Sequence, residues 1–129
     1  MIRLATLQVL ITSILLSNNN HPIILVHGFL GWGKEEVGDK NYWGGENDIE
    51  KYLNDMGYQV YSVSLGPVSS TYDCAIETFY QIKGGQVDYG QEHSEKYKII
   101  RKPEGKTYKG LYPEWNEENP VHLIGYSFG

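Results

Sequence analysis

The residues with the clearest chemical potential are the last five, Gly125-Tyr126-Ser127-Phe128-Gly129, which match the pattern G-x-S-x-G. In this pattern, called a nucleophile elbow, a serine occupies a strained turn between a strand and a helix, so its hydroxyl stands above the sheet. The flanking glycines are needed because strand end and helix start pass so closely that a Cβ would collide with the opposing backbone. We interpret Ser127 as an acyl-transfer nucleophile; the alternative is an ordinary serine in a surface turn.

Two backbone amides are the candidates for stabilising the intermediate of such a reaction. A tetrahedral acyl intermediate carries negative charge on the former carbonyl oxygen, and N–H groups aimed at that oxygen stabilise it. The amide of Phe128 directly follows the serine, and the amide of Phe29 follows His27-Gly28 at the end of an apolar run, where oxyanion loops begin. The Phe29 side chain can also pack as an apolar plug beside the sheet, and the two roles are compatible because the donor is main chain.

Asp73 and His93 are the candidate metal ligands, because carboxylate oxygen and imidazole nitrogen are common ligands of Zn²⁺. Two ligands alone do not make a metal site. Asp73 also lies three residues after Ser70 and fits a helix capping box, while His93 fits a solvated loop. Both interpretations stay open at this point.

Three apolar runs predict the strands that must position these groups. Pro22–Val26 is continuously apolar and rich in β-branched residues, which is typical of a strand buried on both faces of a parallel sheet. Residues 59–65 and 121–124 predict two more strands, the last of which runs directly into the serine motif. The strands alternate with amphipathic helices, so we predict an α/β fold built from parallel strands and helices.

Two amphipathic helices are predicted between the strands. The first begins at the N-cap Asn47 and ends at Gly57. Its apolar face comprises Ile49, Tyr52, Leu53 and Met56. The second is capped by Ser70 and ends at Gly84-Gly85. Its core stripe comprises Ala75, Thr78, Phe79 and Ile82.

Residues 86–120 separate the second helix from the last strand, and their apolar residues follow neither a helical nor a strand periodicity. Residues 86–109 are polar, rich in Tyr, and dense in Lys and Arg. A structureless loop of this length is unusual inside a compact domain. We therefore expect a long structured excursion, ordered by aromatic packing or by a bound ion.

Composition limits the remaining possibilities. With 129 residues the chain has room for one domain, and 11 basic against 16 acidic residues give a net charge of −5, which disfavours nucleic acid as a partner. The single Cys excludes an internal disulfide.

Residues 1–20 carry one charge, then an apolar run shorter than the roughly 20 residues that cross a bilayer, then a polar cluster. This pattern predicts a signal peptide and secretion, or alternatively an ordinary N-terminal helix, with the N-terminal part of the α/β domain at residues 21–129.

Several short strings together are similar to a known family. From about residue 21 onward the chain resembles the secreted staphylococcal and Geobacillus-type triacylglycerol lipases, in the order and close to the spacing of that family. The resemblance implies an α/β-hydrolase fold, hydrolysis of long-chain lipid esters at a lipid–water interface, a zinc-bearing subdomain and a calcium site. The strings are His27-Gly28-Phe29, Tyr42-Trp43-Gly44-Gly45, Gly84-Gly85-Gln86-Val87-Asp88-Tyr89-Gly90, His93-Ser94-Glu95-Lys96-Tyr97 and Gly105-Lys106-Thr107-Tyr108.

Matched position by position, the resemblance makes Ser127 the nucleophile, Phe29 and Phe128 the oxyanion donors, and Asp73 and His93 two of four zinc ligands. The chain departs from the family at the third zinc ligand, a His six residues after the ligand matched by His93, where this chain has Ile99. The stretch 98–104 is also about two residues longer than in the family. The fourth zinc ligand and the calcium site are expected outside the 129 residues.

The predicted activity is that of a carboxylic ester hydrolase, most specifically a triacylglycerol lipase that works through a serine acyl-enzyme and needs no cofactor for its chemistry. In this fold the acid and then the base follow the nucleophile in the sequence. We therefore expect an incomplete α/β-hydrolase sheet that stops after the nucleophile, and a chain that is inactive by itself. The alternative is a catalytically dead lipase-like module that binds lipid or a partner through its Tyr- and Trp-rich loops.

Overall fold

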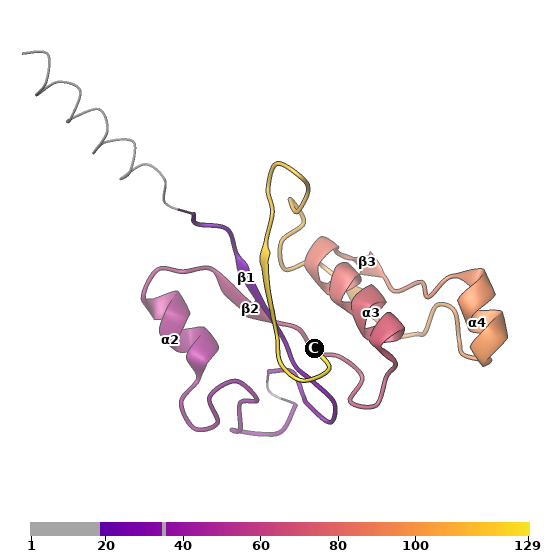
Figure 1. The fold of residues 1–129 in the computed structure, drawn as a ribbon, viewed down its shortest axis with the longest axis horizontal. Helices are drawn as coiled ribbons and strands as arrows, with labels where there is room; N and C mark the ends of the chain where they lie inside the picture. The colour runs from indigo at the N-terminus through magenta and orange to yellow at the C-terminus, as the bar shows by residue number, and fades with distance from the viewer. Residues whose placement is uncertain (1–18, 35) are drawn as a thin grey trace, which may run out of the picture.

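A three-stranded parallel sheet forms the centre of the computed structural model, which describes residues 19–34 and 36–129. The strands are β1 (Ile23–Val26), β2 (Val60–Ser62) and β5 (His122–Gly125), in the order β2-β1-β5 (Figure 1). All three predicted strands are confirmed, with β2 shorter than expected. The predicted signal peptide lies almost wholly outside the described residues.

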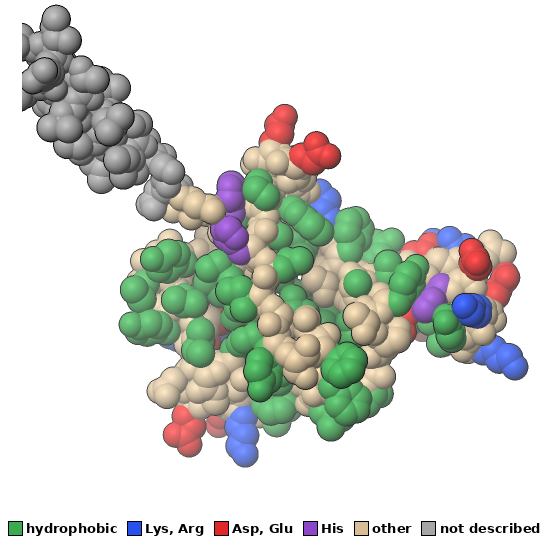
Figure 2. All heavy atoms as spheres, in the orientation of Figure 1, with side chains coloured by type: hydrophobic (Ala, Val, Ile, Leu, Met, Phe, Trp, Pro, Cys, Tyr) green, Lys and Arg blue, Asp and Glu red, His purple; other side chains and the backbone are tan. Residues whose placement is uncertain are grey.

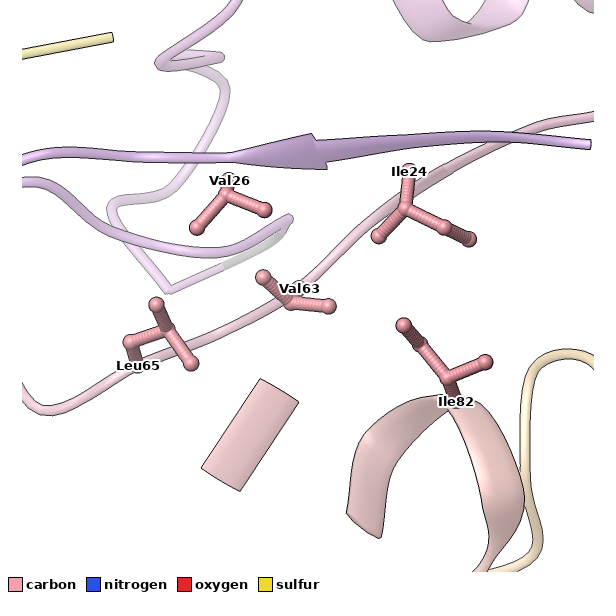
Figure 3. Close-up of a cluster of buried hydrophobic side chains, with 5 residues drawn as sticks. All are labelled: Ile24, Val26, Val63, Leu65 and Ile82. Carbon is pink, nitrogen blue, oxygen red and sulfur yellow. The ribbon is translucent and has the colours of Figure 1, made fainter. Parts of the chain in front are cut away.

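The buried core lies between this sheet and the helix that follows β2. Its centre is a cluster of five apolar side chains from β1, from the chain just after β2 and from the helix (Figure 3). The cluster comprises Ile24, Val26, Val63, Leu65 and Ile82. The central strand β1 is buried, as a parallel strand covered on both faces should be. By contrast, all four residues of the edge strand β5 are exposed.

Helix α2 (Ile49–Asp55) forms where the first helix was predicted, but it begins one residue later than expected. The side chain of Asp48, and not that of Asn47, caps it by accepting a hydrogen bond of 2.9 Å from the Lys51 amide. Gly57, at φ +93°, follows its end as predicted. The predicted apolar face is not buried, because α2 contacts the sheet only along β2 and none of its residues is fully covered.

Helix α3 (Thr71–Lys83) begins at Ser70 and ends at Gly84, as predicted. Of its predicted core stripe, Thr78 and Ile82 are buried, whereas Ala75 and Phe79 are exposed. The buried face is rotated toward Glu77 and Gln81 because these polar side chains bond to neighbouring segments. The Gln81 amide, for example, bonds to both the N–H and the C=O of Ser64, just after β2.

The polar segment after α3 is ordered, as expected. It begins with β3 (Gly85–Gln86), which pairs antiparallel with β4 (Thr107–Tyr108). Helix α4 (Gln91–Tyr97) lies between these two strands in the sequence and projects away from the central sheet (Figure 1). Among the described residues, no helix has the length and apolarity that a membrane span requires.

Candidate active site

Ser127 lies in a tight turn immediately after β5. Its φ of 62° is in the left-handed region, which costs a non-glycine residue about 1 to 3 kcal/mol and is typical of functional turns. The turn is closed by a hydrogen bond of 3.1 Å from the Gly129 amide to the Tyr126 carbonyl. Ser127 is an exposed residue, and its turn lies at the carboxyl end of β5.

The two glycines of the motif are required by close backbone contacts. A Cβ on Gly125 would collide with the backbone of Gly129, and a Cβ on Gly129 would collide with the carbonyl of Val26 in β1. This crowding confirms the steric reason given for the flanking glycines. It also shows that the turn folds back directly onto the end of β1.

The loop that follows β1 contacts the same turn. A Cβ on Gly28 would lie 2.5 Å from the Tyr126 carbonyl oxygen and 2.7 Å from the Ser127 Cβ. The amides of Phe29 and Phe128, one from each loop, donate to no acceptor within the described part of the chain. Their rings lie 6.5 Å apart between centroids. The two loops are thus in contact, and each carries one backbone donor that is unused within the described residues.

Three residues that the sequence did not single out shape this loop. The buried His27 accepts a hydrogen bond of 2.9 Å at Nε2 from the Leu65 amide, so its proton is on Nδ1, which donates to the Gly28 carbonyl. The hydroxyl of Tyr42 accepts from the Gly28 amide at 3.2 Å. Leu30 adopts φ 57°, and its amide donates to the Pro67 carbonyl. His27 and Tyr42 carried a signal, since each belongs to one of the family-like strings, whereas Leu30 carried none.

Within residues 19–34 and 36–129, no imidazole bonds to the Ser127 hydroxyl. Both nitrogens of His27 are engaged with backbone groups. A second Ser–Asp–His set exists on α3 and α4, but Asp73 sits in its middle, accepting from Ser70 at 2.7 Å and from His93 at 2.8 Å. His93 and Ser70 both bond to Asp73 and not to each other, so this set lacks the order of a catalytic triad, in which the imidazole bonds to the hydroxyl.

An open cavity of about 470 Å³ borders the two candidate donors. This volume is in the usual range for small-molecule sites, and apolar groups dominate its lining, which suits an acyl chain. It lies between the loop that follows β1, the loop after β2 and the start of α3. The lining residues include His27, Gly28, Phe29, Pro67, Cys74 and Phe128.

The two candidate metal ligands, Asp73 and His93, are brought together as a hydrogen-bonded pair, and the ring of Tyr72 stacks on His93 at 4.1 Å between centroids. Ile99 stands where the resemblance implies a third ligand, and it offers no donor atom. Among the described residues, no three His, Cys, Asp or Glu side chains converge on one point. A zinc site needs three or four protein ligands, so the residues present do not fit one.

Comparison with known proteins agrees with this geometry. A family model described as "Lipase-like, C-terminal domain" matches residues 19–129. Lipase 2 of Staphylococcus aureus is 45% identical over 118 residues. Among solved structures, EstA from Clostridium botulinum matches with 48% identity and a TM-score of 0.81, and Staphylococcus hyicus lipase matches with 42% identity and a TM-score of 0.77.

These matches cover most of this chain but a small part of the relatives. The S. aureus match spans 86% of this chain and 16% of that lipase. The structural matches span 86% of this chain and 26% of EstA, and 84% of this chain and 28% of the S. hyicus lipase. The architecture is therefore a partial α/β fold of the kind found in these structures, as predicted.

Proposed function

The chain belongs to the family of lipase-like C-terminal domains, and from this premise we propose that it carries the nucleophile and the oxyanion-binding loops of a carboxylic ester hydrolase. The observation that supports this proposal is the contact between two loops, one holding Ser127 and Phe128 and the other holding Phe29. Neither loop could stabilise an acyl intermediate alone, because one amide comes from each.

In the proposed reaction the Ser127 oxygen attacks the carbonyl carbon of an ester, and the carbonyl oxygen takes up the negative charge beside the Phe29 and Phe128 amides. A base accepts the serine proton and returns it to the leaving alcohol, and water then hydrolyses the acyl-enzyme. The proposal places the acid and base of the triad outside the 129 residues, in the chain order expected for this fold.

The proposed substrate is a triacylglycerol at a lipid–water interface. The relatives with which the chain shares 42% to 45% identity are named lipases. Around Ser127 the large apolar side chains are open to solvent, with Phe29 58% and Phe128 69% exposed. Figure 2 shows hydrophobic side chains gathered where Figure 1 marks the C-terminus. An apolar rim of this kind suits contact with lipid, and secretion would place it where such lipid is met.

The proposal is tested by grafting. Residues 19–129 replace the matching 28% of S. hyicus lipase, and hydrolysis of p-nitrophenyl butyrate and emulsified tributyrin is measured. We expect turnover that Ser127→Ala removes, with unchanged circular dichroism. The 129-residue chain alone should hydrolyse neither ester. A folded graft without turnover, beside an active parent lipase, would overturn the proposal.

A second candidate function is a lipid-binding module without catalysis. The exposed rim favours it independently of Ser127, since binding needs the aromatic side chains and not the hydroxyl. Co-sedimentation with phosphatidylcholine-stabilised triolein droplets tests this function. If the chain is such a module, Phe128→Ser should weaken binding to the droplets, whereas Ser127→Ala should not. The graft described above should then fold but show no ester hydrolysis.

A further inference from the structure

The part of the excursion between β3 and β4, residues 87–106, lies where the family resemblance implies zinc. Among the described residues, its donor side chains do not fit that metal. We propose that the excursion is ordered without a metal ion by two carboxylates that bind cations from its returning half: Asp88, which joins the two ends of the loop, and Glu77, which ties the loop to α3. This inference concerns the chain's own residues and does not depend on the role of Ser127.

Asp88 joins the two ends of the loop that carries α4. Arg101 donates to it through two parallel hydrogen bonds, from Nε at 2.7 Å and from Nη2 at 2.8 Å, and the Lys102 ammonium lies 3.4 Å away. The Gly90 amide also donates to Asp88, and the Tyr89 amide donates to the Arg101 carbonyl. Such two-pronged Arg–carboxylate pairs fix geometry as well as charge. These hydrogen bonds hold the pKa of Asp88 well below its usual range.

Glu77 joins both halves of the excursion to α3. Its side chain is only 1% exposed, and one oxygen accepts from the Tyr89 hydroxyl at 2.6 Å and from the Lys106 ammonium at 2.7 Å. Its other oxygen accepts from the Gly66 amide at 3.3 Å. Tyr89 comes from the outgoing half and Lys106 from the returning half, so a single buried carboxylate ties three segments together.

The position of the cations strengthens the inference. Arg101 and Lys102 lie in the stretch 98–104, which the resemblance implies is longer here than in the family. The same stretch contains Ile99 where that family has a ligand. Positive side chains therefore accompany the missing donor, and they pair with a carboxylate at the base of the loop. Figure 2 shows basic and acidic side chains grouped around α4.

Amide hydrogen exchange on the whole chain tests the proposal. The reporters are the amides of Val87 and Tyr89, which bond to the Lys106 and Arg101 carbonyls, and the Val63 amide, which bonds to Leu25 in the sheet, is the reference. We expect the reporter exchange rates to agree within about twofold in EDTA and in excess zinc. Rates that rise more than tenfold in EDTA and recover with zinc would overturn the proposal, as would micromolar one-to-one zinc binding that His93→Ala abolishes.

A matched pair of variants tests the carboxylate directly. Asp88→Asn should speed exchange at Tyr89 at least tenfold in EDTA while leaving Val63 unchanged. Asp55→Asn removes the same charge from an exposed pair with Lys51 on α2, and it should leave both reporters and the Val63 reference unchanged. Equal exchange at Tyr89 in Asp88→Asn and in the parent chain would overturn the proposal. The zinc comparison on the parent chain remains decisive if the variant fails to fold.

Discussion

Substituting Lys106 by Met tests how strongly the buried carboxylate contributes to stability. Met fills much of the volume of the lysine stem but carries no charge, so Glu77 loses its ammonium partner. The carboxylate is 1% exposed and cannot recover the lost interaction from water, whereas Lys106 is itself 32% exposed. Two donors remain, the Tyr89 hydroxyl and the Gly66 amide.

The magnitude follows from these contacts. Removing one partner of a fully buried ion pair costs about 3 to 5 kcal/mol, and the partial exposure of Lys106 with the two remaining donors reduces this to about 2 to 3 kcal/mol. The double variant Glu77→Gln/Lys106→Met has no buried charge left. It should therefore recover about half of the lost free energy of unfolding.

Urea unfolding followed by tryptophan fluorescence and circular dichroism measures these free energies. Lys51→Met is the control, because the pair of Lys51 with Asp55 is exposed (side chain of Lys51 66% exposed) and should contribute less than about 0.5 kcal/mol. The reasoning is refuted if Lys106→Met loses no more stability than Lys51→Met, or if the double variant is less stable than the single one.

Three further predictions concern single residues. Gly28→Ala should lower the free energy of unfolding by about 1 to 3 kcal/mol in urea, because its Cβ would press on the Tyr126 carbonyl at 2.5 Å. A loss below about 0.5 kcal/mol would count against the close contact. Burial, and then the negative charges of Glu77 and Asp73, raise the pKa of the Cys74 thiol. At pH 8 iodoacetamide should therefore modify Cys74 several-fold more slowly than it modifies free N-acetylcysteine, and the two rates should become equal only when guanidinium unfolds the chain. Equal rates in the folded chain would contradict this. Because the pKa of Asp88 is lower in the folded chain than in the unfolded chain, its stabilisation should be fully present above the unfolded value and be lost as the pH falls through the folded one. The stability difference between the parent and Asp88→Asn should accordingly stay constant from pH 7 to 5 and shrink below pH 4, whereas a difference that grows in acid would show the opposite sign.

Local patterns predicted the parts of the fold that depend on neighbouring residues. The strand β1 and the Ser70 cap of α3 could be predicted because each depends on the residues of a single short segment. The same holds for the elbow, whose glycines are explained by contacts within the turn and with the end of β1. Ser127 was singled out as a candidate for this reason.

Other features depend on contacts between distant segments and left no local signal. A glutamate in mid-helix is normally a solvent-exposed residue, so the burial of Glu77 could not be read without knowing that Tyr89 and Lys106 approach it. The burial predicted for the apolar face of α2 was wrong for the opposite reason, since its apolar residues alone do not show that no described segment covers them fully. The sequence of helix α4 shows no helical periodicity of apolar residues, so its formation depends on contacts with neighbouring segments.

The most direct test of the account is the site of covalent labelling by an alkyl fluorophosphonate in the graft of residues 19–129 into S. hyicus lipase. Mass spectrometry of the digested protein should find one phosphonate per molecule on Ser127. Label on another residue, or a folded graft that stays unlabelled while the parent lipase reacts, would contradict the assignment of this hydroxyl as the nucleophile.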